Sequence, residues 1–201
     1  MPNLEADLVA VPELVVDDVV DAAPQPVPGL ADTLRDAEVR VLAAVQRAAD
    51  VPGVLETARG MSHFGEHAIG WLAIGGIGAL ADRERRREWL IATAGVAFAH
   101  GASIGVKRVV RRRRPDDESL RVLVSTPSKL SFPSSHATST TAAAVLFGGL
   151  TRKPLVRLLV PPMALSRLVL GVHFPTDVLT GSLLGAAVAA GVRRIIRRNA
   201  R

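Results

Sequence analysis

The sequence contains no cysteine and no tyrosine, and only 3% of its 201 residues are aromatic. The lack of cysteine excludes disulfides, thiolate metal sites and a cysteine nucleophile. The scarcity of aromatic rings leaves few platforms on which bases could stack, although the chain is basic overall. We therefore predict no nucleic-acid partner.

Basic side chains are missing from the start of the chain. Residues 1–30 carry six acids and no Lys or Arg, so the remaining residues hold 25 basic and 13 acidic groups. This start also lacks the positive and apolar regions of a secretory signal peptide. We expect residues 1–30 to form an acidic, disordered tail.

Apolar residues make up 48% of the chain and are concentrated in blocks. The five blocks cover residues 67–81, 89–106, 130–150, 155–172 and 178–192. Each is somewhat short against the roughly 20 residues that cross a bilayer, but flanking arginines can extend a span by snorkelling. Small residues throughout the blocks favour close helix packing in lipid. We predict an all-α fold, a polytopic membrane helix bundle with about five spanning helices in residues 60–201.

Residues 31–59 differ from these blocks because they mix apolar and charged positions. Leu34, Val41, Val45 and Ala48 follow helical spacing, with arginines and acids elsewhere on the wheel. The segment is too charged to span a bilayer, and we expect an amphipathic helix at the membrane surface. Alternation of the five spans would place residues 107–134 and His173 on the same side as this helix.

The first polar cluster on that side is KRVVRRRRPDD, residues 107–117. An arginine run alone is also typical of a positively charged flank of a span or of a patch that binds anionic lipid. The cluster therefore does not by itself identify a site.

The second cluster is FPSSHATSTT, residues 132–141. Ser134 is a candidate N-cap, which places Ser135 and His136 in the first helical turn, where free N–H groups favour an anion. A serine-capped helix with an incidental histidine is the structural alternative.

The third cluster is SRLVLGVHFPTD, residues 166–177. An arginine within an apolar block is costly in a membrane and indicates a functional partner. Asp177 follows His173 by four residues, and a carboxylate beside an imidazole makes it a better base or nucleophile. A purely structural His–Asp hydrogen bond is the alternative.

Together the three clusters supply cations, a helix N-terminus and two histidines, one with an acidic partner. Arginine forks match phosphate oxygens bidentately, and lysine adds a point charge. Two histidines in unequal environments suit a nucleophile and a general acid. The combination indicates phosphoryl transfer without a metal or other cofactor.

These residues resemble the type-2 phosphatidic acid phosphatase family, which is related to the vanadium haloperoxidases. The family motifs are K-x6-R-P, P-S-G-H and S-R-x5-H-x3-D. The matching positions are Lys107, Arg114, Pro115, Pro133, Ser134, Ser135, His136, Ser166, Arg167, His173 and Asp177. Every spacing agrees over roughly residues 60–195, but Ser135 stands where the family has glycine.

The resemblance implies a mechanism and a role for each matching residue. His173, oriented by Asp177, would attack phosphorus and form a phosphohistidine, and His136 would protonate the leaving oxygen and then activate water. The phosphate would be held by Lys107, Arg114, Arg167 and the N–H groups of Ser134 and Ser135. His63, His67 and His100 match no motif, and we interpret them as packing or interfacial residues, with Glu66 and His67 at the edge of a substrate path.

The resemblance also implies a phosphate-bearing lipid as substrate and the bilayer as partner. The chain is most similar to small family members that dephosphorylate decaprenyl-phosphoryl-5-phosphoribose in the synthesis of arabinan precursors. Polyprenyl pyrophosphates, phosphatidate and phosphatidylglycerophosphate are alternative substrates. A vanadate-dependent haloperoxidase and a non-catalytic scaffold that binds anionic lipid are alternatives of another class.

The side of the membrane on which the site lies is suggested by the distribution of basic residues. We expect a multi-pass protein of the plasma membrane with its site at one surface. Lys and Arg are equally numerous on the two faces, but catalysis accounts for Lys107 and Arg114. Without these two residues the face that carries the site has fewer basic residues than the other face, which favours an extracytoplasmic site. The absence of a signal peptide favours a cytoplasmic site. The sequence does not indicate the oligomeric state.

Overall fold

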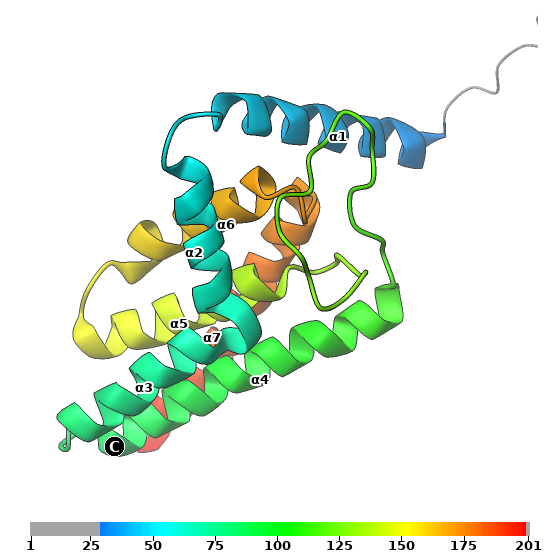
Figure 1. Ribbon diagram of the computed structural model, residues 1–201. Coiled ribbons are helices and arrows are strands. Elements are labelled where there is room, and N and C mark those ends of the chain that lie inside the picture. The colour runs from blue at the N-terminus through cyan, green and yellow to red at the C-terminus, as the bar shows by residue number, and fades with distance from the viewer. Residues whose placement is uncertain (1–28, 200–201) are drawn as a thin grey trace, which may run out of the picture.

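The computed structural model describes residues 29–199, which form a bundle of α-helices (Figure 1). The helices are α1 Leu30–Ala48, α2 Val54–Gly65, α3 Ile69–Ala81, α4 Arg86–Val110, α5 Ser135–Thr151, α6 Leu155–Val169 and α7 Pro175–Asn199, with a 3₁₀ turn at Glu66–Ala68. Among these residues the β pairing is limited to one isolated bridge between Arg113 and Leu130. The predicted all-α class is confirmed, and the expected acidic tail lies outside the described residues except at its last two positions.

The segment 31–59, expected as one amphipathic helix, is divided in the structure. It supplies α1 and the first half of α2, which are separated by residues 49–53. Pro52 disfavours helical geometry in the residue before it, and Gly53 has a φ of +85°, which interrupts the helix. The break allows α2 to turn away from α1 and run down the side of the bundle (Figure 1).

Helix α5 lies at the centre of the bundle and packs against α4, α6 and α7. Its buried residues include the four consecutive hydroxyl residues 138–141. The Thr138 hydroxyl donates to the Ser134 carbonyl at 2.9 Å and that of Ser139 to the Ser135 carbonyl at 3.0 Å. These bonds within the helix satisfy hydroxyls that have no access to water.

Helix α7 approaches α5 closely through two glycines one turn apart. A methyl group on Gly181 would meet the Ser134 carbonyl at 2.5 Å, and one on Gly185 would collide with the Thr138 carbonyl. Glycine pairs at this spacing let helix backbones pack in direct contact. The contact holds together the N-terminal halves of α5 and α7.

The outer helices expose large apolar side chains, whereas α5 buries polar ones. Examples are Ile69, Ile77 and Leu80 of α3, Phe98 of α4, Leu158 of α6 and Leu179 and Leu183 of α7. Apolar surface of this extent marks contact with lipid or another protein. Helices α4 and α7 are long and apolar enough to cross a membrane.

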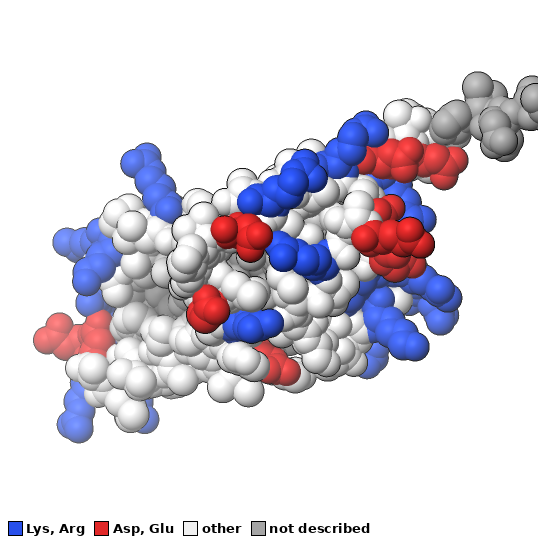
Figure 2. All heavy atoms as spheres, turned by 45° about the horizontal axis from the view of Figure 1, so that its top comes forward, with Lys and Arg blue, Asp and Glu red and all other residues white. Residues whose placement is uncertain are grey.

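The two ends of the bundle are formed by different elements (Figure 1). Helix α1 and the long connection 111–134 lie at one end, and the α3–α4 turn and the C-terminal end of α7 lie at the other. Basic side chains project from both ends of the molecule (Figure 2). All three polar clusters meet at the end that carries α1, as alternation of the helices predicted.

Candidate active site

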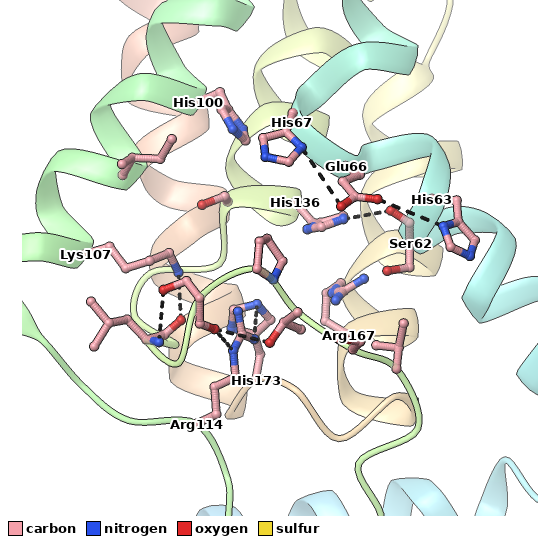
Figure 3. A pocket seen from close by; sticks show the side chains of 18 of the residues that line it. Ser62, His63, Glu66, His67, His100, Lys107, Arg114, His136, Arg167 and His173 are labelled. Atoms are coloured by element: carbon pink, nitrogen blue, oxygen red, sulfur yellow. Dashed lines mark hydrogen bonds and ion pairs between the residues drawn. The ribbon is translucent and has the colours of Figure 1, made fainter.

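A cavity of about 450 Å³ opens at the α1 end of the bundle. Its walls come from α2 and the 3₁₀ turn, α4, the connection 124–130, the start of α5, the end of α6 and the segment before α7. Six residues of the predicted site line it: Lys107, Arg114, Ser135, His136, Arg167 and His173. Figure 3 shows Lys107, Arg114, His136, Arg167 and His173 converging from separate elements.

Lys107 lies at the end of α4, where its ammonium group is almost fully buried. The group donates to the carbonyls of Ser131 at 3.0 Å and Pro133 at 2.8 Å, and lies 3.4 Å from that of Leu130. Its protons therefore hold the segment that leads into α5. Lys107 contributes a fixed positive charge to the cavity and shapes the loop around it.

Arg114 and Arg167 place two guanidinium groups at the cavity. Arg114 donates from Nε to the Ser128 carbonyl at 2.8 Å and from Nη1 to the Val172 carbonyl at 2.6 Å. Burial lowers the pKa of Arg114 to about 10, so the group stays charged at neutral pH. Arg167 is 1% exposed, and its buried Nε and Nη1 have no hydrogen-bond partner within the described residues. An anion in the cavity would satisfy these donors, since buried N–H groups without acceptors are costly.

Ser134 and Ser135 are adjacent in the sequence but have different contacts in the structure. Ser134 caps α5, because its hydroxyl accepts from Ala137 N, and its own N–H donates to the Asp177 carbonyl at 2.9 Å. The structure thus corrects the expectation that the Ser134 N–H is free for phosphate. Ser135 does line the cavity, and its hydroxyl lies 2.8 Å from the Ser103 hydroxyl of α4. Its hydroxymethyl group, absent from the family glycine, therefore has a partner in α4.

His173 is 2% exposed and lies between Asp177 and Arg114. Its Nδ1 is 3.6 Å from Asp177 Oδ2, and its Nε2 is 3.4 Å from Arg114 Nη1. The first distance exceeds that of a formed hydrogen bond, as is common in catalytic sites without substrate. Burial, followed by the charges of Arg114 and Arg167, lowers the pKa of His173 well below the usual imidazole value. The imidazole is therefore neutral at neutral pH, and Nε2 is the nitrogen on the side away from Asp177.

His136 projects from the first turn of α5 and is held by α2. Its Nε2 lies 2.9 Å from the Ser62 carbonyl. A carbonyl only accepts, so Nε2 carries the proton and Nδ1 is left to exchange one. Gly65 gives the ring room, since a methyl group there would meet His136 Cδ2 at 2.6 Å.

The wall formed by α2 and the 3₁₀ turn contains groups that lie outside every motif. His63, Glu66, His67 and His100 all line the cavity. The Glu66 carboxylate is 4.0 Å from Nδ1 of His63 and 4.0 Å from Nδ1 of His67 (Figure 3). The sequence predicted packing or interfacial positions for these histidines, with Glu66 and His67 at the edge of a substrate path; the structure places all three histidines at the cavity, which the sequence suggested only for His67. We call Ser62, His63, Glu66, His67 and His100 the α2 wall, although His100 comes from α4.

A second set of charged groups lies behind His173, away from the cavity. Arg112 donates to Asp177 Oδ1 at 3.0 Å and also contacts Glu38 of α1. Glu38 Oε1 in turn accepts from the N–H of Thr176 at 3.1 Å. The sequence patterns did not identify Glu38 or Arg112, because one lies in an unrelated amphipathic helix and the other within a run of arginines.

Comparisons with known proteins agree with this geometry. The PAP2 superfamily model matches residues 88–201. The chain is 60% identical over 154 residues to decaprenylphosphoryl-5-phosphoribose phosphatase of Mycobacterium tuberculosis, covering 76% of this chain and 87% of that protein. It is 61% identical over 145 residues to the protein of the same name from Mycolicibacterium smegmatis, covering 72% and 81%.

A solved structure shares the fold. The crystal structure of a transmembrane PAP2 type phosphatidylglycerolphosphate phosphatase from Bacillus subtilis superposes with a TM-score of 0.66, at 24% identity, over 83% of this chain and 88% of that one. The match by the family model and the identity to curated relatives confirm the resemblance that the three motifs indicated. The chain belongs to the PAP2 superfamily.

Proposed function

We propose that this PAP2 phosphatase hydrolyses the 5-phosphate of decaprenylphosphoryl-5-phosphoribose through a phosphohistidine intermediate. The observation that carries the chemistry is a neutral, buried His173 with Asp177 on one side and three cationic side chains nearby. The proposed substrate is the one named for relatives that are 60% and 61% identical.

In the first step, Nε2 of His173 attacks phosphorus, and the bond between phosphorus and the sugar oxygen breaks. Asp177 accepts a hydrogen bond from Nδ1–H and stabilises the positive charge that develops on the ring. Nδ1 of His136, protonated once the phosphate dianion is bound beside it, gives its proton to the departing oxygen. A positioned proton donor of this kind contributes about 10²–10⁴-fold.

In the second step, water attacks the phosphohistidine. Nδ1 of His136, now neutral, takes a proton from the water, and the bond between phosphorus and His173 breaks. The products are inorganic phosphate and the dephosphorylated lipid, and both histidines return to their starting states.

The charge of the phosphoryl group is balanced by Arg114, Arg167 and Lys107. Arg167 supplies the two unpartnered N–H groups, while Lys107 acts as a fixed charge because its protons already bind carbonyls. Preorganised donors of this kind usually account for most of the stabilisation in phosphoryl transfer. The N–H of Ser135, at the start of α5, completes the proposed phosphate site.

The α2 wall supports a sugar as the leaving group. His136, the proposed proton donor, is fixed to Ser62 of this wall, so the departing oxygen lies beside Glu66 and His67. A carboxylate accepts hydrogen bonds from neutral hydroxyls and repels anions. A ribose fits this surface better than the phosphate of a polyprenyl pyrophosphate does.

The arrangement of exposed apolar side chains supports a multi-pass protein of the plasma membrane. Helices α3 to α7 correspond to the five predicted spans, although α3, with 13 residues, extends only about 20 Å. In this placement the cavity lies at one membrane surface and α1 lies along it, so that the lipid tail stays in the bilayer. The balance of basic residues favours the extracytoplasmic surface. A cysteine placed at Ser125 and treated with an impermeant thiol reagent tests the side, because the chain has no other cysteine.

The decisive experiment measures phosphate release by purified wild type and His173→Ala on a panel of substrates, with and without EDTA. The panel contains decaprenylphosphoryl-5-phosphoribose, phosphatidate, phosphatidylglycerophosphate and a polyprenyl pyrophosphate. We expect the ribose substrate to give the highest kcat/KM, EDTA to have no effect, and the variant to be inactive.

Two results would contradict the proposal. Equal turnover by wild type and His173→Ala would exclude the phosphohistidine mechanism, and a preference for another panel member would replace the substrate. Halide oxidation by peroxide after addition of vanadate would point to the haloperoxidase alternative.

A further inference from the structure

We propose that Glu38 of α1 and Arg112 are positioning residues that hold Asp177 in the orientation required by His173. The inference rests on the proposed function, because it concerns the same nucleophile. It assigns a role in catalysis to a helix that lies outside the part of the chain matched by the family model.

Arg112 is the link between α1 and the catalytic carboxylate. Its Nη1 donates to Asp177 Oδ1 at 3.0 Å and to the Thr176 hydroxyl at 2.7 Å, while its Nη2 contacts Glu38 Oε2. The guanidinium carbon also lies over the Phe174 ring, 4.2 Å from its centre, in a cation–π contact. These contacts fix the plane of the guanidinium fork.

Glu38 holds both Arg112 and the start of α7. Its Oε1 accepts from the N–H of Thr176 at 3.1 Å and from the Thr176 hydroxyl at 2.6 Å. The first N–H groups of a helix have no partner within the helix, so Glu38 acts as a cap supplied by another helix. The Glu38 side chain is 13% exposed, and its charge is therefore only partly screened by water.

Asp177 depends on these contacts because its side chain has no access to solvent. Oδ1 is taken by Arg112, and Oδ2 accepts from Phe174 N at 2.8 Å and faces Nδ1 of His173. If Arg112 is removed, the carboxylate can rotate, and it also loses the cation that compensates its burial. Oδ2 would then be less well placed to accept from Nδ1 of His173 when the ring becomes charged during the attack.

Neither Glu38 nor Arg112 lines the cavity, so neither can contact the substrate directly. Their loss should therefore lower the rate of attack by His173 and leave substrate binding intact. Groups that orient metal ligands typically contribute about 10- to 100-fold to activity, and we expect a similar effect for groups that orient Asp177. A reduced kcat at an unchanged KM is the signature that separates this role from a contact with substrate.

The experiment compares Glu38→Gln with Asp36→Asn, which makes the same change of charge at an exposed position of the same helix. Arg112→Met is compared with Arg113→Met in the same way. For each, kcat, KM, the rate of phosphohistidine formation by rapid quench, and Tm in detergent are measured. We expect kcat to fall about 10-fold in Glu38→Gln and about 100-fold in Arg112→Met, with KM within twofold of wild type and both controls close to wild type.

The double variant Glu38→Gln/Arg112→Met should lose less kcat than the product of the two single losses, because Glu38 acts in part through Arg112. Should a variant fold poorly, Arg112→Lys, which keeps the charge but not the fork, should still show a lower kcat at an unchanged KM. Wild-type kcat in the folded variants, or equal effects in the controls, overturns the inference. If wild type releases no phosphate, the proposed function fails instead, whereas an inactive His173→Ala beside a fully active Glu38→Gln removes only this inference.

Discussion

The two walls of the cavity differ in charge, in burial and in origin. The wall around His173 is built from motif residues within 88–201, is cationic, and buries Arg167 almost completely. The α2 wall comes mainly from residues before the family match, and the side chains of Glu66 and His67 are 48% and 60% exposed. The first wall suits a phosphoryl group that every substrate shares, and the second suits a leaving group that differs between substrates. Chemistry and selectivity are thus separable by mutation.

His136 lies where the two walls meet, and apart from the loss of His173 its loss should have the largest effect. We expect His136→Ala to lower kcat for the ribose 5-phosphate substrate by about 10²–10⁴-fold, because the departing alkoxide needs a proton. A nitrophenyl phosphate, whose leaving group needs no proton, should lose less in the same variant. Because His136 also activates water in the second step, the rate of phosphohistidine formation is compared, and an equal loss of that rate on both substrates would remove the role of proton donor.

Arg167 tests whether the cationic wall acts in the same way on every substrate. Arg167→Lys keeps the charge but removes the fork, and we expect kcat/KM to fall about 10²–10³-fold for every substrate of the panel. The measurement is steady-state phosphate release, with Arg108→Lys at the cavity rim as the matched control. A loss confined to one substrate would contradict the division between the walls.

Glu66 tests whether the α2 wall selects the leaving group. Glu66→Gln should lower kcat/KM for the ribose substrate by about 10-fold, since a hydrogen bond to a charged acceptor is worth about 1.5–3 kcal/mol. Activity on a polyprenyl pyrophosphate should stay constant or rise, because the repulsion of its second phosphate is removed. Parallel losses on both substrates would show that the α2 wall does not select the leaving group.

The titration of His173 predicts a change in stability with pH. The unfolded chain takes up a proton on this residue near pH 6.5, whereas the folded state, whose His173 pKa is lowered, does not. Below that pH the unfolded state binds more protons, so stability falls with acidification by at most about 1.4 kcal/mol per pH unit. Tm in detergent should therefore decrease less between pH 7 and pH 5 in His173→Gln than in wild type. An identical decrease in both proteins would contradict a neutral, buried His173.

Ser135 should give the smallest change. Ser135→Gly restores the family residue, and we expect kcat/KM to stay within about threefold of wild type because the N–H remains. Loss of the bond to Ser103 and the added backbone freedom should lower stability by about 1 kcal/mol each. A large loss of activity would show that the hydroxyl itself contacts the phosphate.

The cationic wall could be predicted from the sequence, and the rest of the site only in part. The third motif places Arg167 at the end of α6, His173 in the short turn that follows and Asp177 in the first turn of α7, so their proximity follows from their closeness in the sequence. Glu38 and Glu66 reach the site only through tertiary packing of α1 and α2, and no local spacing relates them to His173. The failure at Ser134 has the same cause, because its N–H is taken by the carbonyl of Asp177 from another helix.

The helices themselves were predicted with unequal success. The uncharged runs 67–81 and 89–106 lie within or close to α3 and α4, because uncharged runs bounded by charge leave little ambiguity. The run 130–150 begins five residues before α5, since residues 130–134 form the loop held by Lys107. The break at Pro52 and Gly53 was present in the sequence as a turn signal, but the apolar spacing on either side concealed it.

The contact of Gly181 with the backbone of α5 makes catalysis depend on the absence of a methyl group. Gly181 faces the carbonyl of Ser134, the residue whose N–H holds α7 at Asp177. A side chain at this position would push the two helix starts apart, and His136 and Asp177 would separate with them. A change of one carbon atom, made at a residue that does not line the cavity, would thus change the distance between the proposed acid and the proposed nucleophile without contacting either.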